Sequence, residues 1–255
     1  MPRDLRIYLI RHGESEANLD KSVNALLPDH RVPLSVEGLR QAAEAGEILR
    51  SHLSETALTG QASRSDFAPP KIRMWRSPYL RTRQTSDAIL RALGGLTSDG
   101  GLVLDVKEKS QLREQSFGLF DGVPDQDLPK LFPREHALYQ KAEQHEGRFW
   151  APMPMGESRC DVAERVHATF GTFHRDAERH DIHDLIVVSH GVTIRAFAYA
   201  WLGYEWEWFE RQPNPGNCSI WMIEGNVDRG FIHKGWSATA GHNAQEKRES
   251  GEIST

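Results

Sequence analysis

The sequence predicts a three-layer α/β/α protein with a mainly parallel central sheet and helices on both faces. Short apolar runs that suit buried strands alternate with longer segments whose apolar residues recur at helical spacing. The 255 residues suffice for one large domain with a substantial core, and no linker divides them. We therefore expect one domain over residues 1–236, followed by a polar tail over 237–255 that we expect to be disordered.

The N-terminal part of the chain predicts a strand, a helix and a loop. Residues 6–10 form an apolar run with the length of a short buried strand. Ser35 is a suitable N-cap, and apolar residues from there to residue 53 recur on one helical face. Residues 54–70 are rich in Ser, Thr, Gly and Pro, so we expect a surface loop.

The middle of the chain has clear strand and helix patterns up to about residue 106 and an irregular pattern over residues 110–156. A second strand is expected at residues 71–75, and Ser77-Pro78 favours a helix that starts there and runs to about residue 93. Residues 102–106 predict a third strand. Residues 110–156 contain short helical pieces broken by proline and glycine, and we interpret them either as a cap that shapes specificity or as a plain connector.

The C-terminal part returns to a clear alternation of patterns. Apolar residues at spacings of three and four predict a long helix over about 157–179. The most strand-like run, residues 184–188, follows it. A helix over about 192–202 and a strand at 218–223 complete the series. Because strands alternate with helices, we expect the strands to be mainly parallel.

Composition and charge narrow the class of protein. The 31 basic and 36 acidic residues give a net charge of −5, which argues against nucleic acid or a membrane as a partner. The only cysteines are Cys160 and Cys218, so neither a disulfide framework nor a four-cysteine zinc site is expected. The apolar run near the N-terminus is short and no other run is long and uncharged enough to span a membrane, so we expect neither a signal peptide nor a membrane span. We expect a cytoplasmic protein with two reduced thiols.

Two expected strands end in the same dipeptide. His12-Gly13 follows the first strand, and His190-Gly191 follows the strand at 184–188. Ligands of open α/β sheets bind beyond the carboxyl ends of the strands, so we expect both histidines at one crevice. Glycine directly after each histidine lets the backbone approach a ligand and leaves its N–H group accessible.

Arginines complete a predicted phosphate pocket. Arg81 lies in the first turn of the helix expected after Ser77, where its donors add to those of the helix N-terminus. Arg11 directly precedes His12. Arg83 lies two positions from Arg81, so it should face away toward the surface. Two histidines and two arginines from three strand ends predict a site for a phosphate group.

Six motifs follow one another in order along the chain. They are Ile10-Arg-His-Gly-Glu-Ser15 with Asn18, Pro33-Leu-Ser-Val-Glu-Gly38, Ser77-Pro-Tyr-Leu-Arg-Thr-Arg-Gln-Thr85, Leu112-Arg-Glu-Gln-Ser-Phe-Gly118, Met155-Gly-Glu-Ser158 and Ser189-His-Gly191. A lone Arg-His-Gly is common by chance, but the ordered set is specific. From about residue 5 to about 224, the chain resembles the histidine phosphatase superfamily, also called phosphoglycerate-mutase-like. Loop details such as Asp29-His-Arg-Val-Pro-Leu34 resemble a mutase-like phosphatase branch rather than the glycolytic enzyme.

The resemblance implies roles for the residues that bind and attack phosphate. His12 is implied to be the nucleophile that becomes phosphorylated, and a neutral imidazole suits this chemistry at neutral pH. Arg11, Arg81 and His190 are implied to surround the phosphoryl oxygens and stabilise their charge in the transition state. Asn18 is implied to be a further neutral donor to the same group.

Two further groups complete the expected site. Glu114 matches the family's general acid, which protonates the leaving alkoxide and later activates the water that cleaves phosphohistidine. For that role its pKa must be raised, which burial can achieve. The backbone N–H of Gly191 is expected to bind substrate. No cofactor and no metal are expected.

Three functions remain open at the level of the sequence. The leading one is a metal-independent phosphomonoesterase that acts on a small phosphorylated substrate. A cofactor-dependent phosphoglycerate mutase would need further basic residues after Glu114. An acidic run follows instead, at Asp121, Asp125 and Asp127, and it would repel a second phosphate. A non-catalytic phospholigand sensor is disfavoured because both histidines are present. Sugar phosphates, phosphoglycerate-type metabolites, nucleotide monophosphates and phosphoproteins all remain possible substrates.

Other groups of residues are interpreted as structural. Three histidines near the end of the long helix fit no zinc-ligand spacing, namely His174, His180 and His183. Glu14 and Arg113 either pair with charges of the pocket or face water. The aromatic stretch from Trp201 to Phe209 favours core packing, and the alternative is a contact surface of a homodimer.

Overall fold

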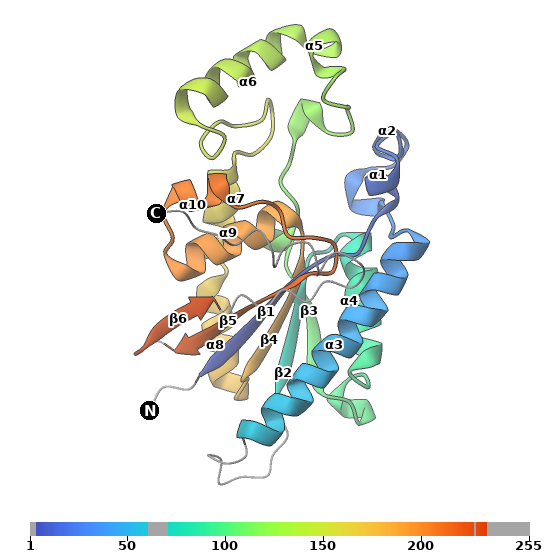
Figure 1. The fold of residues 1–255 in the computed structure, drawn as a ribbon, viewed down its shortest axis with the longest axis vertical. Helices are drawn as coiled ribbons and strands as arrows, with labels where there is room; N and C mark the ends of the chain where they lie inside the picture. Colours follow the sequence, from blue (N-terminus) through green and yellow to red (C-terminus); the bar gives the residue numbers. More distant parts are fainter. Residues whose placement is uncertain (1–3, 61–70, 227, 234–255) are drawn as a thin grey trace, which may run out of the picture.

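A six-stranded sheet in the order β3-β2-β4-β1-β5-β6 forms the centre of the computed structural model (Figure 1). The structure describes residues 4–60, 71–226 and 228–233, so the tail expected over 237–255 and residues 61–70 of the expected loop lie outside the described residues. The strands are β1 (Leu5–Arg11), β2 (Ile72–Arg76), β3 (Val103–Glu108), β4 (Asp184–Ser189), β5 (Ile220–Asn226) and β6 (Gly230–His233).

Four of these strands are parallel, and the other two are antiparallel. β1, β4, β2 and β3 run in one direction, as the alternation with helices predicts. β5 pairs antiparallel with β1, and β6, which the sequence pattern does not predict, pairs antiparallel with β5. The side chain of Asn226 accepts hydrogen bonds from the N–H groups of Asp228 and Arg229, which turns the chain from β5 into β6.

Helices cover both faces of the sheet and produce the three predicted layers (Figure 1). One face carries α3 (Val36–Gly60) and α4 (Leu80–Ala92), and the other carries α7 (Arg159–His167), α8 (Phe170–His180) and α9 (Gly191–Leu202). Alternate residues of a strand point to opposite faces, so β1 contributes to both cores. The predicted α/β/α fold class is confirmed.

The start of α3 is predicted correctly, but its end is not. Ser35 Oγ accepts the N–H of Gly38 at 2.9 Å, as an N-cap does. The helix continues to Gly60, whereas the sequence analysis ends it at residue 53. The stretch from Ser54 contains Glu, Ala and Leu, which are good helix formers. Their propensity outweighs the Ser and Thr that suggest a loop.

α4 begins at Leu80 and not at Ser77. The backbone N–H of Ser77 donates to the carbonyl of Val188 at 3.0 Å, and its hydroxyl lies 2.8 Å from His190 Nε2. These two contacts keep Ser77 at the edge of the sheet, so the helix starts at Leu80, two residues after the expected first helical residue Pro78. Arg81 is still in the first turn, as predicted.

The long helix expected over 157–179 is two helices, α7 and α8. The hydroxyl of Thr169 donates to the carbonyl of Val166 at 2.7 Å, at the point where the two helices meet. Such a local bond competes with the continuous helical ladder. The predicted apolar face is nevertheless kept, because both helices bury it against the same core.

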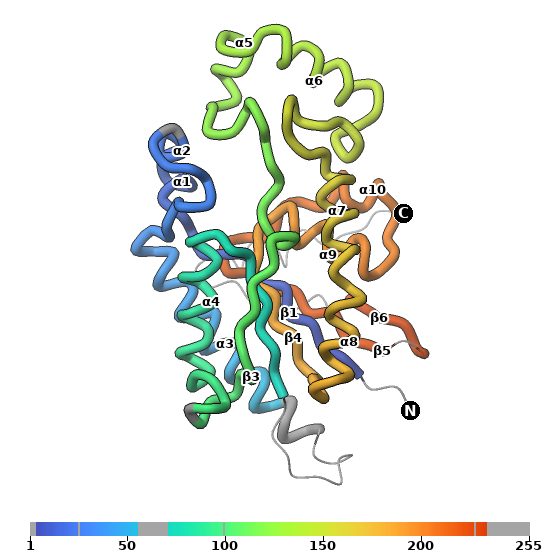
Figure 2. The backbone as a smooth tube through the Cα atoms, turned by 180° about the vertical axis from the view of Figure 1, so that it is seen from behind, coloured from blue at the N-terminus to red at the C-terminus, as the bar shows by residue number. Residues whose placement is uncertain are grey.

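Residues 110–156 are called the cap below. Their helical part stands away from the sheet layers, beyond the carboxyl ends of the parallel strands (Figures 1 and 2), whereas Leu112 and Phe149, near the two ends of the cap, pack into the core. The cap contains α5 (Leu128–Leu131) and α6 (Pro133–Glu146). The ring of Phe120 packs against those of Phe132 and Tyr139, which gives the cap a small core of its own. A Cβ on Gly122 would lie 3.1 Å from Asn24, so the cap also touches α2 (Val23–Leu26).

The aromatic stretch near the C-terminal end packs inside the chain. Trp201 stacks on Phe197 and on His174, with ring centroids 5.4 and 4.8 Å apart. Phe209, in α10 (Trp206–Arg211), is fully buried. Trp201 and Phe209 therefore pack as predicted, whereas Trp206 is 37% exposed, and the homodimer contact stays a prediction.

Candidate active site

His12 and His190 lie side by side at the carboxyl edge of the sheet. β1 and β4 pair in parallel with Arg11 opposite Ser189, so the residue after each strand reaches the same edge. The two imidazole rings have centroids 5.2 Å apart, and the residues are 4% and 0% exposed. The strand-end rule used in the sequence analysis thus brings the two histidines together.

The hydrogen bonds of His12 assign its tautomer. Nδ1 lies 2.7 Å from the carbonyl oxygen of Gly13, which can only accept, so Nδ1 carries the ring hydrogen. Nε2 accepts from Nε of Arg81 at 3.3 Å. Both contacts assign the same neutral form, in which Nε2 holds a free electron pair. That atom is therefore the nucleophilic one.

Arg81 contacts His12 directly and is itself held by Asp29. Nη1 of Arg81 donates to the Asp29 carbonyl at 2.6 Å and to Oδ1 at 2.9 Å, and Nη2 donates to Oδ2 at 3.1 Å. The carboxylate thus occupies positions on the guanidinium fork at which a phosphate could bind. The sequence analysis does not assign Asp29 to the site. Its contact depends on how a 3₁₀ turn, Asp29–Arg31, packs against α4, and no periodic pattern encodes that packing.

Arg11, the last residue of β1, brings a second guanidinium group to the site. Nη1 donates to the carbonyl of Pro215 at 2.6 Å, which fixes the side chain. Nε is buried and has no hydrogen-bond partner among the described residues. A buried donor without an acceptor is unfavourable, so this atom is suited to bind an anion.

Ser77 and Tyr79 hold His190. Ser77 Oγ lies 2.8 Å from His190 Nε2 and accepts the N–H of Tyr79 at 3.4 Å, so its own hydrogen is free to donate to the imidazole. When Ser77 donates in this way, the ring hydrogen of His190 is on Nδ1. Nδ1 is buried without a partner among the described residues, and it can donate to a bound anion.

Glycine at positions 13 and 191 allows close contacts within the protein, but the N–H of Gly13, expected to be accessible to a ligand, donates to Thr85 Oγ1 at 3.1 Å. A Cβ on Gly13 would lie 2.4 Å from the carbonyl oxygen of Gly38, and one on Gly191 would lie 3.0 Å from the side chain of Asn214. Gly191 opens α9, with His190 as the N-cap. The free N–H groups of this helix terminus add positive potential beside His190.

Burial and positive neighbours keep both histidines neutral. Burial lowers the pKa of His12 well below its ordinary 6.5, and the charges of Arg81 and Arg11 lower it further, against the hydrogen bond to Gly13. Burial likewise lowers the pKa of His190, and the charges of Arg81 and Arg11 lower it further. The arrangement combines a neutral nucleophile with two permanent positive charges, which is what attack on a phosphate anion requires.

These shifts predict a loss of stability in acid. His12 and His190 stay neutral in the folded protein but take up protons in the unfolded chain below its pKa of about 6.5. Stability is therefore highest above pH 6.5 and falls with pH toward the folded-state pKa values. The two histidines should contribute about 2.7 kcal/mol per pH unit between them. Urea unfolding at pH 7.5, 6.0 and 5.5 measures this slope.

A single-histidine variant isolates the effect from other titrating groups. His190→Gln should reduce the slope of the unfolding free energy against pH by the contribution of one proton, about 1.4 kcal/mol per pH unit. This reduction does not depend on the effect of the substitution on stability at pH 7.5. An unchanged slope would show that His190 does not stay neutral in the folded protein.

Glu114 lies on a loop that follows a short 3₁₀ turn, Ser110–Leu112. Its Oε1 accepts the N–H of Gln115 at 2.9 Å. Burial raises the pKa of Glu114 above 4.5, although that hydrogen bond and the charges of Arg81 and Arg11 oppose the rise. A general acid needs a raised pKa, and burial shifts the pKa of Glu114 in that direction.

Asn18 lies in α1 (Glu16–Leu19), where its oxygen has a capping role. Oδ1 accepts from the N–H and the hydroxyl of Ser15 at 2.9 and 3.0 Å, and from Asn217 Nδ2 at 3.4 Å. Only the amide nitrogen of Asn18 can therefore donate to a ligand. Its contact with substrate stays a prediction.

The charged residues that the sequence leaves open are paired. Glu14 Oε1 accepts the hydroxyl of Ser35 at 2.7 Å, and Arg113 pairs with Glu157 at 2.5 Å. Arg83 lies at the surface, as predicted, and pairs with Glu108 at 2.7 Å. Across residues 4–60, 71–226 and 228–233, the structure contains no metal-ligating cluster, and none of its helices is long and apolar enough to cross a membrane.

Comparison with known proteins finds relatives with phosphatase and mutase names. The phosphoglycerate mutase-like protein AT74 of Arabidopsis thaliana is 36% identical over 86% of this chain, which spans 64% of that relative's length. The broad-range acid phosphatase DET1 of Saccharomyces cerevisiae is 28% identical over 86% of this chain and 84% of its own. A solved mycobacterial glucosyl-3-phosphoglycerate phosphatase has a TM-score of 0.66 at 21% identity, and covers 93% of this chain and 100% of its own.

A family model gives the broader assignment. The model of the histidine phosphatase superfamily (branch 1) matches residues 7–237, which include both His-Gly strand ends and the arginine of α4. The extent of this match agrees with the fold and with the paired histidines at the sheet edge. The chain belongs to the histidine phosphatase superfamily.

Proposed function

We propose that the protein is a metal-independent phosphatase that hydrolyses small phosphomonoesters through a phosphohistidine on His12. The observation that carries the proposal is the tautomer of His12, whose Nδ1 hydrogen is held by Gly13 while Nε2 faces Arg81. This geometry supports nucleophilic attack without a further base, because Nε2 needs no deprotonation. The names of the relatives support phosphatase chemistry in the same family.

In the proposed first step, His12 Nε2 attacks the phosphorus atom and the ester P–O bond breaks. Glu114 gives its proton to the leaving oxygen, so the alcohol departs neutral. Arg81, Arg11 and the Nδ1 hydrogen of His190 stabilise the charge of the phosphoryl oxygens. In the second step, the Glu114 carboxylate takes a proton from water, and the water oxygen attacks phosphorus. The N–P bond then breaks, which releases phosphate and restores neutral His12.

Acidic residues beside the pocket favour hydrolysis over mutase activity. The carboxylate of Asp29 already lies on Arg81. Burial raises the pKa of Asp121, in the cap, and the charge of Asp29 raises it further, so the two carboxyl groups are close enough to repel. A bisphosphate would have to place its second phosphate near these groups, at an electrostatic cost.

A product assay with EDTA present tests the proposal. Purified protein is given a panel of sugar phosphates, nucleotide monophosphates and 3-phosphoglycerate, and free phosphate and 2-phosphoglycerate are both measured. Phosphate release from one or more substrates is the expected result. Isomerisation of 3-phosphoglycerate without phosphate release would replace the proposal with a mutase. Activity that disappears with EDTA would contradict the metal-independent mechanism.

Glu114→Gln should slow turnover most for substrates with poor leaving groups. Glutamine cannot donate the proton, so the kcat for alkyl phosphates should fall by about 10²- to 10⁴-fold. The leaving group of 4-nitrophenyl phosphate needs little protonation, so its kcat should fall far less. Steady-state kinetics with both substrates measure the difference. An equal loss for both would mean that Glu114 is not the acid.

The pH dependence should follow from the same residue. Because burial raises the pKa of Glu114, the protonated acid persists into a higher pH range than for an exposed glutamate, and it is lost as pH rises through that pKa. His12 stays neutral well below pH 6.5. We expect an alkaline fall in kcat with alkyl phosphates that Glu114→Gln removes.

A further inference from the structure

Glu114 depends on its backbone for its position. The Gln115 N–H is the one hydrogen bond that its carboxyl group makes with the described residues. Residues 113–117 form neither helix nor strand, so no ladder of backbone bonds holds this stretch. A general acid nevertheless has to stay within about an ångström of its working position. Something other than secondary structure must fix the loop.

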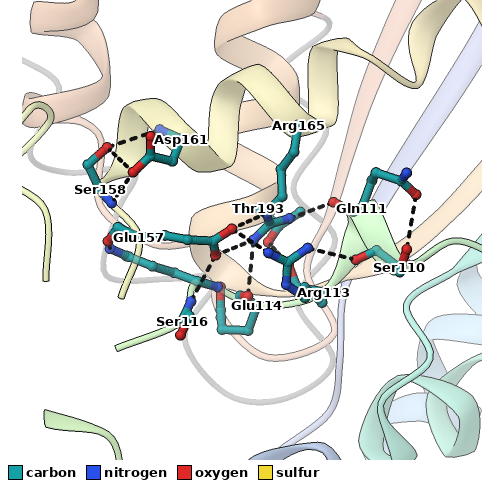
Figure 3. Close-up of polar contacts among 11 residues, drawn as sticks. Ser110, Gln111, Arg113, Glu114, Ser116, Glu157, Ser158, Asp161, Arg165 and Thr193 are labelled. Atoms are coloured by element: carbon teal, nitrogen blue, oxygen red, sulfur yellow. Dashed lines mark hydrogen bonds and ion pairs between the residues drawn. The ribbon is translucent and has the colours of Figure 1, made fainter. Parts of the chain in front are cut away.

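Side chains from α7 and from the residue before its N-cap supply those contacts (Figure 3). Arg165 donates from Nη1 to the carbonyl of Gln111 at 2.5 Å and from Nη2 to the carbonyl of Glu114 at 3.0 Å. Glu157 accepts the N–H of Ser116 on Oε2 at 2.9 Å, while its own carbonyl accepts from Gln115 Nε2 at 2.7 Å. Arg165 and Glu157 therefore hold the loop on both sides of Glu114.

The two side chains are joined to each other by a two-pronged ion pair. Arg165 Nε donates to Glu157 Oε1 at 2.8 Å and Nη2 to Oε2 at 3.0 Å, and the side chains are only 12% and 15% exposed. Arg113 Nη2 adds a further bond to Oε1 at 2.5 Å. A bidentate pair with little exposure fixes both partners in direction as well as distance.

The pKa values of Glu157 and Glu114 are shifted in opposite directions. Burial would raise the pKa of Glu157, but the hydrogen bonds from Arg165 and Ser116 and the charges of Arg165 and Arg113 hold it below its ordinary range. Burial raises the pKa of Glu114 instead. One carboxylate thus stays charged as an anchor, and its neighbour can hold a proton. Opposite pKa shifts of two nearby carboxyl groups are typical of sites in which one group stays charged and the other donates a proton.

We propose that Glu157 and Arg165 are positioning residues for Glu114, which they hold at the leaving-group oxygen by clamping the loop 111–116. This inference rests on the proposed function. The clamp also joins the start of the cap to its end, because the N–H of Glu157 donates to the carbonyl of Ser116 at 2.9 Å. The segment that shapes the pocket and the loop that carries the acid are therefore fixed by the same pair.

Glu157→Gln should reproduce a weaker form of the Glu114→Gln defect. We expect kcat to fall about 10- to 100-fold for alkyl phosphates, because a displacement near 1 Å can cost that much. With 4-nitrophenyl phosphate, kcat should change less than about threefold. Inhibition by orthovanadate should stay unchanged, since both arginines and both histidines are intact. Arg165→Lys keeps the charge but loses the fork, and it should give the same pattern.

Asp161→Asn is the matched control. Asp161, in the first turn of α7, is a carboxylate close to Glu157. Its Oδ2 accepts the Ser158 N–H at 2.7 Å, but it makes no hydrogen bond to the loop 111–116. Its loss should lower the unfolding temperature without changing the ratio of alkyl to aryl phosphate turnover. A purely structural role for Glu157 would give this same result, and that outcome would overturn the inference.

A double variant separates this inference from the proposed function. Glu114→Gln combined with Glu157→Gln should be no slower on alkyl phosphates than Glu114→Gln alone, because the clamp acts only through Glu114. Additive losses would overturn the clamp while leaving the phosphatase assignment intact. A wild-type protein without phosphatase activity, or a Glu114→Gln variant without a leaving-group effect, would overturn the proposed function and the inference with it.

Discussion

His12→Ala should abolish turnover, with kcat reduced by about 10⁴-fold or more. Removal of a nucleophile leaves no route to the covalent intermediate, and losses of this size are usual for such residues. The side chain is buried at the carboxyl end of β1, with Nε2 directed at Arg81, and no other imidazole among the described residues has this arrangement. Phosphate release from the best substrate of the panel measures the effect.

Two further observations make this result specific to the nucleophile. Rapid acid-free quenching of wild-type protein with ³²P-labelled substrate should trap an alkali-stable, acid-labile label that His12→Ala lacks. His180→Ala, at the exposed end of α8, should keep both activity and label. Persistent labelling in His12→Ala would place the covalent chemistry on another residue.

Arg81→Ala should lower kcat/KM by about 10²- to 10³-fold. Its guanidinium contacts His12 and carries donors that can stabilise the transferring phosphoryl group, and loss of one such stabilising group typically costs this much. Arg81→Lys should recover little activity, because an ammonium group cannot reproduce the fork. Orthovanadate inhibition should weaken in both variants, which ties the loss to the anion site.

Arg83→Ala provides the control on the same helix. Arg83 is 45% exposed in its side chain and pairs with Glu108 at the surface, so its loss removes the same charge from α4 without reaching His12. Its kcat/KM should stay within about twofold of wild type. A large loss in this variant would mean that the positive charge of α4 acts from a distance and that direct contact is not required.

Local patterns are enough to predict much of the fold and the centre of the site. Apolar runs give the buried strands, and the strand-end rule for parallel sheets brings His12 and His190 to one edge before any contact is known. Arg81 is predicted correctly although the start of its helix is not, because a shift of two residues still leaves it in the first turn. A prediction that only places a residue in a given helical turn or at a given sheet edge stays correct when the end of the element is misplaced by a few residues.

Contacts between distant segments are beyond this kind of reasoning. Asp29 reaches Arg81 across 52 positions, and Arg165 reaches the Glu114 carbonyl across 51. Neither residue differs in pattern from a solvated surface charge until the chain is folded. The antiparallel direction of β5 could not be predicted from local pattern either, because the side-chain alternation of a strand is identical in both directions.

The carbonyl that fixes the His12 tautomer belongs to the backbone of the next residue. A backbone acceptor is present whatever side chain occupies a position, so no substitution at a distant residue can delete it, as it could delete a carboxylate partner. The orientation of His12 is therefore fixed within two consecutive residues that directly follow β1. Substitutions in the cap or the surface loops therefore leave this hydrogen bond in place, so the orientation of His12 is inherited independently of those segments.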